Sequence, residues 1–209
     1  MKLLVLGATG ATGLQIVTQA LERAHEVTAF VRDPDKLAIS DRRLRVVTGN
    51  ILDNARAVAE AVRGQDAVIS ALGVGNSRKS FNIISRSMRA IVPAMESHGV
   101  RRLIFVSAFG VGETRRDVPL VPRIVQRLLL ADVFADKKAS EDDLRRSGLD
   151  WTLVYPVILT NGPRTAKYLV GERLDLHGLP KISRADVADF VLSQLEDATY
   201  LRKGVLISD

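Results

Sequence analysis

The chain has 209 residues, of which 46% are hydrophobic and 26% are charged, an ordinary composition for a soluble globular protein. This length suits one domain with a substantial core, and no apolar run approaches the roughly 18 residues of a membrane span. The chain has no cysteine, which excludes disulfide bonds, thiolate metal sites and a cysteine nucleophile. We therefore expect a single domain over residues 1–209, a cytoplasmic location and no membrane span.

The net charge of +6 raises the question of an anionic partner. The basic residues come in scattered pairs with carboxylates close to most of them, and no aromatic residues interleave with them. No recognisable nucleic-acid module is present, so we expect no nucleic-acid partner. A modest basic excess also suits a protein whose ligand carries three phosphate groups.

The first thirteen residues combine an apolar strand, Lys2–Leu6, with a glycine-rich turn that opens into an amphipathic helix. The turn has the spacing G-x-x-G-x-x-G, with Gly7, Gly10 and Gly13 as its glycines. Glycines allow a tight turn and a close approach of the backbone to a pyrophosphate. The helix N-terminus offers unpaired N–H groups and the positive end of a dipole, which bind phosphate oxygens. This order of strand, turn and helix predicts a dinucleotide site.

Short β-branched runs alternate with helical periodicity along the rest of the chain. Strands that are apolar throughout, such as the run Leu103–Val106, are typical of a parallel sheet that is covered on both faces. The alternation predicts an α/β, doubly wound, Rossmann-type sheet, mostly parallel, of about seven strands. The predicted strands are Lys2–Leu6, Glu26–Val31, Leu44–Thr48, Ala67–Ser70, Leu103–Ser107, Trp151–Val154 and Val205–Ile207.

Two features interrupt this alternation. Pro93 lies inside a helical run, Met88–Met95, so we expect a kink or a helix break there. The stretches 110–122 and 156–181 are long and non-periodic, and both follow strands whose carboxyl ends bind ligands in open α/β sheets. We expect these two stretches to form the walls of a substrate pocket.

The second predicted strand runs into Arg32 and Asp33. A carboxylate at this place binds the ribose 2′-hydroxyl of NAD, whereas an arginine accommodates the 2′-phosphate of NADP. Arg32 comes first, and an arginine–phosphate contact contributes about 1.5–3 kcal/mol, so we expect NADP(H) to be favoured over NAD(H). The alternative is an exposed ion pair between Arg32 and Asp33, which would contribute little.

Further motifs follow the later strands. They are Val31-Arg32-Asp33-Pro34, Gly49-Asn50-Ile51, Ala71-Leu72-Gly73, Ser107-Ala108-Phe109 and Ser147-Gly148-Leu149-Asp150-Trp151-Thr152. Together with the glycine turn, this series resembles the NAD(P)H-binding atypical short-chain dehydrogenase/reductases, and among them most resembles the flavin reductase/biliverdin-IXβ reductase type. The resemblance spans nearly the whole chain, and its cofactor half carries the more specific motifs.

The resemblance implies which positions hold the cofactor. The pyrophosphate side is implied at Gly7, Thr9, Gly10, Ala11, Thr12 and Gly13. The 2′-phosphate is implied at Arg32, with Arg78 as a second phosphate contact, and the adenine at Asn50 and Ile51. The ribose is implied at Ala71, Leu72 and Gly73, and the nicotinamide at Ser107, Ala108, Pro156, Val157 and Ile158.

The chain departs from ordinary short-chain dehydrogenases at their Tyr-x-x-x-Lys pair, in which the tyrosine transfers a proton. Lys137 and Lys138 lie in the corresponding helix, but Val133 and Phe134 stand four residues before them. Reduction of a flavin or tetrapyrrole can dispense with such an acid, because the ring accepts hydride and takes its proton from water. Ser107 is the obvious polar candidate for a catalytic role, and its alternative role is that of a satisfied hydroxyl at a strand end. No residues have metal-ligand spacing, so no metal is expected.

Two functions remain open. One is an NADPH-dependent reductase of a planar, electron-poor acceptor such as a flavin, a biliverdin-like tetrapyrrole or a quinone. The alternative is a non-catalytic NADP(H)-binding sensor of the nitrogen-metabolite-repressor type. A sugar-nucleotide epimerase is disfavoured by the missing tyrosine. We expect a monomer or a weak homodimer whose partner is a small molecule.

Overall fold

The computed structural model describes residues 1–75, 77, 79–118 and 130–209. Within these ranges one main sheet is built from eight strands, most of them parallel to their neighbours. They are β1 (Lys2–Leu6), β2 (Glu26–Val31), β3 (Leu44–Thr48), β4 (Ala67–Ser70), β5 (Arg102–Val106), β6 (Asp150–Pro156), β8 (Leu169–Gly171) and β10 (Lys203–Ser208). Their order is β3-β2-β1-β4-β5-β6-β10-β8, and β8 is antiparallel to β10. The predicted doubly wound α/β fold is confirmed.

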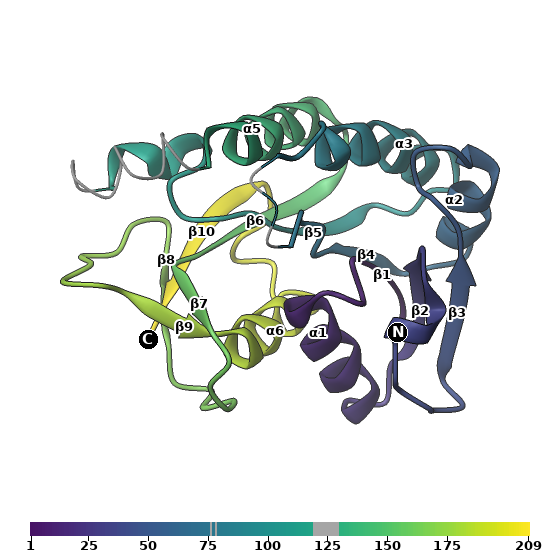
Figure 1. Ribbon diagram of the computed structural model, residues 1–209, viewed down its shortest axis with the longest axis horizontal. Helices are drawn as coiled ribbons and strands as arrows, with labels where there is room; N and C mark the ends of the chain where they lie inside the picture. The colour runs from purple at the N-terminus through teal and green to yellow at the C-terminus, as the bar shows by residue number, and fades with distance from the viewer. Residues whose placement is uncertain (76, 78, 119–129) are drawn as a thin grey trace.

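The helices of the described ranges cover both faces of the sheet (Figure 1). On one face lie α1 (Ala11–Glu22) and α6 (Arg184–Ser193). On the other lie α2 (Ala55–Val62), α3 (Ile83–Ser97) and α5 (Ala131–Arg146). Two short 3-10 helices, η1 (Pro34–Lys36) and η2 (Gly112–Arg116), follow β2 and β5. None of the helices described is both long enough and apolar enough to cross a membrane.

The alternation of side chains along β1 explains why the sheet needs helices on both faces. Leu3 and Val5 pack into the cluster on the side of α1 and α6, and Leu4 and Leu6 pack into the cluster on the opposite side. All four side chains are 0–1% exposed. Since both faces of the strand bury apolar surface, the hydrophobic effect fixes the sheet as the middle of three layers.

Of the kink or helix break expected at Pro93, the break does not occur, because α3 continues through this residue to Ser97. Proline removes one backbone hydrogen bond and favours a kink. Pro93 lies on the exposed side of α3, whereas Met88, Ile91 and Met95 on the other side are fully buried. Packing of this apolar face stabilises the helix more than the missing hydrogen bond destabilises it.

The stretch 156–181 is more regular than the sequence predicts. It contains β7 (Ile158–Thr160), the edge strand β8 and the start of β9 (Lys181–Ser183), and β7 pairs with β9 in a separate parallel sheet. Each of these strands has three residues, which is too short for an alternating pattern to show. In the other predicted wall, residues 112–116 form η2, and residues 119–122 lie outside the described ranges.

Candidate functional site

The predicted motifs meet at one edge of the sheet. In the parallel register, Leu6 lies opposite Phe30 and Ser70, Ser70 lies opposite Phe105, and Val106 lies opposite Val154. The glycine turn and the segments after β2, β4, β5 and β6 therefore all leave the sheet at its carboxyl edge. This is the edge at which open α/β sheets bind their ligands.

Close packing requires two glycines of the turn. Gly7 has a φ of +76°, and a Cβ there would lie 2.6 Å from the carbonyl oxygen of Ala71. A Cβ at Gly13 would lie 2.0 Å from the carbonyl oxygen of Gly7. Both separations are far shorter than van der Waals contact, so the start of α1 packs directly on the turn and the turn packs on the segment after β4.

The start of α1 presents backbone donors to solvent. The N–H of Gly10 donates to the carbonyl oxygen of Gly7 at 3.0 Å, and the N–H of Leu14 donates to that of Gly10 at 2.8 Å. Between them, the amides of residues 11–13 lie in the first turn, where a helix supplies no acceptor, and the cap residue makes no side-chain hydrogen bond. Because Thr9, Gly10 and Ala11 are exposed and Thr12 is partly exposed, the amides of residues 11 and 12 and the positive end of the helix dipole are open to a phosphate.

Arg32 stands directly after β2 with its side chain exposed. Asp33 accepts a hydrogen bond from the amide of Asp35 at 3.2 Å and pairs with Lys36 at 3.2 Å. In the described part of the chain no carboxylate pairs with Arg32, so the ion pair between Arg32 and Asp33 considered above does not form. The guanidinium is therefore available for an anion from outside the chain.

Asn50 and Ile51, predicted beside the adenine, are partly engaged in their own loop. The side-chain oxygen of Asn50 accepts from the amide of Leu52 at 3.2 Å, and its side-chain nitrogen donates to Asp53. Ile51 is 7% exposed and packs against the core that includes Phe30. Their place beside the adenine stays a prediction.

The segment after β4 adjoins the glycine turn, because the amide of Ala71 donates to the carbonyl oxygen of Leu6 at 3.0 Å. Leu72 is partly exposed and Gly73 is exposed, with no atom within 4 Å of a Cβ built on Gly73. This segment is therefore open on the side where the sequence predicts the ribose. Arg78, predicted as a second phosphate contact, lies outside the described residues.

Ser107 is hydrogen-bonded to Glu141, a residue that none of the sequence motifs indicates. Its hydroxyl donates to Oε1 of Glu141 at 2.5 Å, and its amide donates to the carbonyl oxygen of Val154 at 2.8 Å. Ser107 is 4% exposed and Glu141 is 1% exposed. Burial raises the pKa of Glu141, while hydrogen bonds from Ser107 and Tyr155 and the positive charge of Arg145 oppose that rise.

Tyr155 is the second donor to Glu141. Its hydroxyl donates to Oε2 at 3.0 Å, and Arg145, which pairs with Glu113 at 3.0 Å, donates to the tyrosine oxygen at 3.4 Å. Tyr155 is fully buried, so it cannot stack on an acceptor. A chain of hydrogen bonds thus runs from Arg145 through Tyr155 and Glu141 to Ser107.

Lys137 lies one helical turn before Glu141 on α5. Its Nζ donates to the carbonyl oxygen of Val106 at 3.0 Å and lies 5.4 Å from the centre of the Phe105 ring. Burial lowers the pKa of Lys137 to about 8, against the raising effects of Glu141 and Asp136. Val133, four residues before Lys137, is 8% exposed and supplies no acid.

The two segments predicted beside the nicotinamide are joined to each other. The amide of Phe109, which follows Ser107 and Ala108, donates to the carbonyl oxygen of Pro156 at 3.0 Å. Val157 is 6% exposed, whereas Ile158 is 51% exposed. Ile158 is therefore the residue of segment 156–158 that presents most surface to a ligand.

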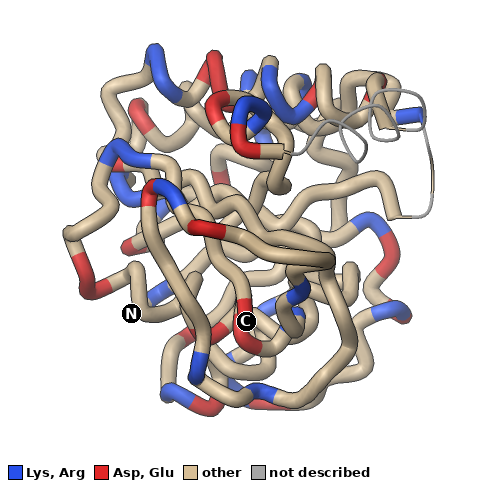
Figure 2. Tube along the Cα trace, turned by 90° about the vertical axis from the view of Figure 1, so that its left-hand side faces the viewer, with Lys and Arg blue, Asp and Glu red and all other residues tan. Residues whose placement is uncertain are grey.

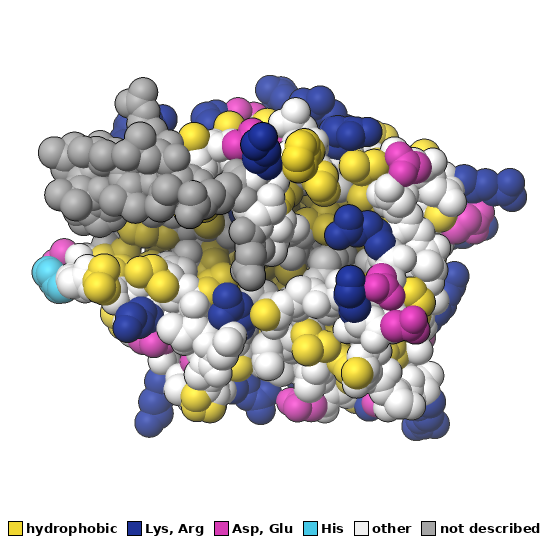
Figure 3. All heavy atoms as spheres, in the orientation of Figure 1, with side chains coloured by type: hydrophobic (Ala, Val, Ile, Leu, Met, Phe, Trp, Pro, Cys, Tyr) yellow, Lys and Arg dark blue, Asp and Glu magenta, His cyan; other side chains and the backbone are white. Residues whose placement is uncertain are grey.

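Apolar side chains gather around a hollow on the face shown in Figure 3. Ile158 on β7, Leu169 on β8 and Leu179 before β9 are large hydrophobic residues that remain 51%, 58% and 71% exposed. The amide of Ile158 donates to the carbonyl oxygen of Pro180 at 3.2 Å, which brings Ile158 beside the Leu179 segment. Exposed apolar surface of this kind marks binding sites in soluble proteins.

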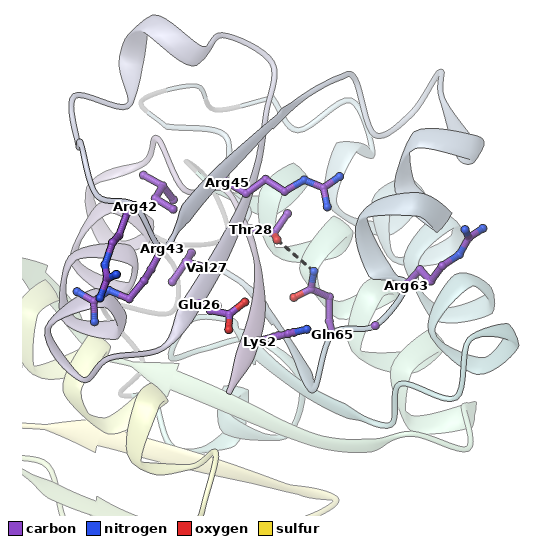
Figure 4. Close-up of a pocket in the computed structure, with 11 residues that line it drawn as sticks. Lys2, Glu26, Val27, Thr28, Arg42, Arg43, Arg45, Arg63 and Gln65 are labelled. Atoms are coloured by element: carbon purple, nitrogen blue, oxygen red, sulfur yellow. Dashed lines mark hydrogen bonds between the residues drawn. The ribbon is translucent and has the colours of Figure 1, made fainter.

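A second hollow, of 460 Å³, lies at the opposite, amino-terminal edge of β1–β3 (Figure 4). Its lining includes Arg42, Arg45 and Arg63, whose guanidinium groups lie apart from one another in the view. Figure 2 likewise shows basic and acidic residues interspersed along the visible trace rather than gathered into a stripe. The amide donors at the start of α1 lie next to one another at the carboxyl edge, whereas these arginines do not converge on a common point.

The fold, the glycine turn and the open amides of α1 define a dinucleotide-binding protein of the Rossmann type. The chain belongs to the NAD(P)H-binding family, whose model matches residues 7–198. The predicted relation to the atypical short-chain dehydrogenase/reductases is thereby confirmed.

Several known proteins are similar to this chain. An uncharacterized chloroplastic protein of Arabidopsis thaliana is 32% identical over 205 residues, covering 93% of this chain and 71% of its own. The uncharacterized protein YwnB of Bacillus subtilis is 26% identical over 206 residues, covering 94% and 92%. Because the Arabidopsis relative is chloroplastic, the cytoplasmic location stays a prediction.

Two solved structures share the fold. ChuY, an anaerobillin reductase from Escherichia coli O157:H7, has a TM-score of 0.81 at 24% identity, covering 99% of this chain and 96% of ChuY. A short-chain dehydrogenase/reductase from Veillonella parvula in complex with NADP has a TM-score of 0.84 at 21% identity, covering 100% and 94%. At these identities the likeness concerns the fold alone.

Proposed function

We propose that this protein is an NADPH-dependent reductase that transfers a hydride to a planar, electron-poor acceptor such as a flavin, a biliverdin-like tetrapyrrole or a quinone. The observation that carries the proposal is the carboxyl edge of the sheet, where a tightly packed glycine turn, an arginine without a carboxylate partner among the described residues and a buried serine follow strands of the same sheet. Exposed apolar residues on β7, on β8 and before β9 add to this arrangement. Membership of the NAD(P)H-binding family supports the cofactor class.

The cofactor half of the site fits a dinucleotide with a 2′-phosphate. The amides of residues 11 and 12 would hold the pyrophosphate, because they are open donors at a helix N-terminus. Arg32 would bind the 2′-phosphate, since its guanidinium has no carboxylate partner among the described residues while Asp33 is engaged by Lys36. When bound, the nicotinamide supplies the hydride.

The acceptor half of the site is apolar. Ile158, Leu169 and Leu179 offer exposed hydrophobic surface, which would favour an apolar ring over a polar sugar or a small hydroxy acid. The chain's residues would orient this ring and exclude water from it. ChuY is an anaerobillin reductase on the same fold, which is compatible with a tetrapyrrole as one of the three acceptor types.

In the described part of the chain, no side chain at the predicted nicotinamide segments is free to donate a proton to the acceptor. Val133 replaces the tyrosine of ordinary short-chain dehydrogenases, the Ser107 hydroxyl donates to Glu141, and Lys137 donates to a backbone carbonyl. This arrangement supports an acceptor that takes its proton from water, as flavins, tetrapyrroles and quinones do, over a ketone that needs an acid.

The decisive experiment is steady-state oxidation of NADPH by the purified protein, followed by absorbance, with FMN, riboflavin, biliverdin and a quinone as acceptors and NADH in parallel. We expect saturable turnover with at least one acceptor and a preference for NADPH. Tight binding of NADPH without turnover on any acceptor would overturn the reductase and favour the non-catalytic sensor. Binding of neither cofactor would overturn both functions.

A further inference from the structure

Glu141 occupies a position that stability alone does not explain. The residue is 1% exposed, and a carboxylate at such depth is costly unless both oxygens are hydrogen-bonded. Replacing a buried ionic group with an apolar side chain is often neutral or stabilising. The fold nevertheless makes room for Glu141, because a Cβ at Gly112 would lie 2.2 Å from Oε2 and a Cβ at Gly204 would lie 2.6 Å from the ring of Tyr155.

With Glu141 ionised, the hydrogen bonds around it have one direction, because a carboxylate only accepts. An arginine can only donate, so the oxygen of Tyr155 accepts from Arg145 and the proton of Tyr155 points to Oε2 of Glu141. The other oxygen, Oε1, then accepts the single proton of Ser107. The carboxylate of Glu141 thereby determines the orientation of both hydroxyls.

We infer that Glu141 is a positioning residue that holds the proton of Ser107 away from the nicotinamide pocket, so that Ser107 offers its oxygen lone pairs there and accepts a hydrogen bond. This inference rests on the proposed function, which places Ser107 beside the nicotinamide. The group that fits such an acceptor is the amide N–H of the carboxamide. A ligand group that needs a hydrogen-bond donor at Ser107 would bind more weakly.

Glu141→Gln tests the inference because it keeps size and burial but turns one acceptor into a donor. Because Arg145 already donates to the Tyr155 oxygen, an amide oxygen facing Tyr155 avoids a second donor there, so the new amide nitrogen would face Ser107 and turn the serine proton toward the pocket. We expect the dissociation constants of NADPH and NADH to rise equally, by about tenfold, since both carry the same nicotinamide. Fluorescence titration of each cofactor measures this effect without requiring turnover.

The sharper readout is a double-mutant cycle with Ser107→Ala. If Glu141 acts through Ser107, Glu141→Gln adds less than about twofold to the dissociation constant once Ser107→Ala is present, because the hydroxyl it orients is gone. Independent effects that multiply would overturn the inference. Should Glu141→Gln fail to fold, Glu141→Asp repeats the cycle, since the shorter side chain withdraws the carboxylate from Ser107.

Asp136→Asn is the matched control. Asp136 is on the same helix and also 1% exposed, but its oxygens accept from the amides of Ile84 and Ser85 at 3.0 and 2.9 Å. We expect this variant to lower the melting temperature and leave the cofactor dissociation constants unchanged. A wild type that binds neither cofactor would overturn the proposed function and the inference together, whereas a wild type that binds both without coupling in the cycle would overturn the inference alone.

Discussion

At the scale of single residues, the cofactor preference depends on Arg32. Its guanidinium is exposed and has no carboxylate partner among the described residues, so it can bind a phosphate without first breaking an internal ion pair. Arg32→Ala should weaken NADPH binding by about 1.5–3 kcal/mol, roughly one to two decades, and leave NADH binding nearly unchanged. Titration of both cofactors measures the difference.

Arg42→Ala is the control for this experiment, because Arg42 lines the hollow at the opposite edge of the sheet. It should leave the affinity for both cofactors unchanged. Equal loss of NADPH and NADH binding in Arg32→Ala would contradict the assignment of Arg32 to the 2′-phosphate.

A second residue-scale prediction concerns Lys137, whose pKa of about 8 lies below the ordinary 10.5 because of burial. Between these two values the unfolded chain binds a proton at this lysine that the folded chain does not. The free energy of unfolding should therefore rise with pH over this window, by at most about 1.4 kcal/mol per pH unit. Urea unfolding from about pH 8 to about pH 9.5, below the ordinary pKa of tyrosine, should show this rise in the wild type.

Lys137→Met keeps the length and the apolar stem of the side chain but cannot titrate. The pH-dependent rise attributed to Lys137 should therefore disappear in this variant, while other groups titrate as before. If the wild type and Lys137→Met had parallel profiles over the window, the lysine would not be the buried titrating group.

At the scale of elements, the glycine turn holds strand, turn and helix together. Gly13→Ala places a methyl group against the carbonyl of Gly7, where a Cβ would be 2.0 Å away, and should lower stability by about 1–3 kcal/mol. Gly73→Ala is the matched control, since no atom lies within 4 Å of its Cβ and its φ is not positive. Differential scanning calorimetry should show a lower melting temperature for Gly13→Ala than for Gly73→Ala. Equal melting temperatures would refute the close packing of the turn.

The elements also show why some of the molecule was predictable. The seven strands expected from the sequence all exist. Six of them are largely buried runs between turn signals, and β1 alternates between two packed faces, whereas the edge strand β3 is largely exposed. The short strands β7, β8 and β9 were missed because three residues carry no period. Their pairing depends on contacts between segments more than 20 residues apart, such as Thr160 opposite Ser183.

The candidate site, like the fold, could be predicted from the sequence only in part. The glycine turn has a local signature, and Ser107 follows an apolar strand, so both could be found from neighbouring residues. Glu141 could not, because it is one of several charged residues in the polar helix α5 and its contact with Ser107 spans 34 residues. Its spacing from Lys137 places both on one helix face, but no local pattern distinguishes this buried carboxylate from the partly exposed ones that follow it.

At the scale of the whole molecule, the predicted cofactor site extends over several neighbouring strands along one edge of the sheet. Arg32 follows β2 and Ser107 follows β5, and the intervening order β2-β1-β4-β5 puts three interstrand spacings, about 14 Å, between the ends of these strands. A dinucleotide laid along this edge would contact segments from both halves of the sheet. Its binding should therefore stabilise the domain as one unit rather than one loop.

Binding of the cofactor should therefore raise the melting temperature of the whole protein. A ligand at one hundred times its dissociation constant stabilises the native state by about 2.7 kcal/mol, or roughly 5–11 °C for a chain of this size. At equal concentration, NADPH should raise the melting temperature more than 2′,5′-ADP, because the fragment reaches Arg32 and the glycine turn but not Ser107. NADPH should also exceed NADH, which lacks the 2′-phosphate. A shift with 2′,5′-ADP as large as that with NADPH would mean that the nicotinamide contributes nothing at Ser107, and an equal shift with NADH would remove the role of Arg32.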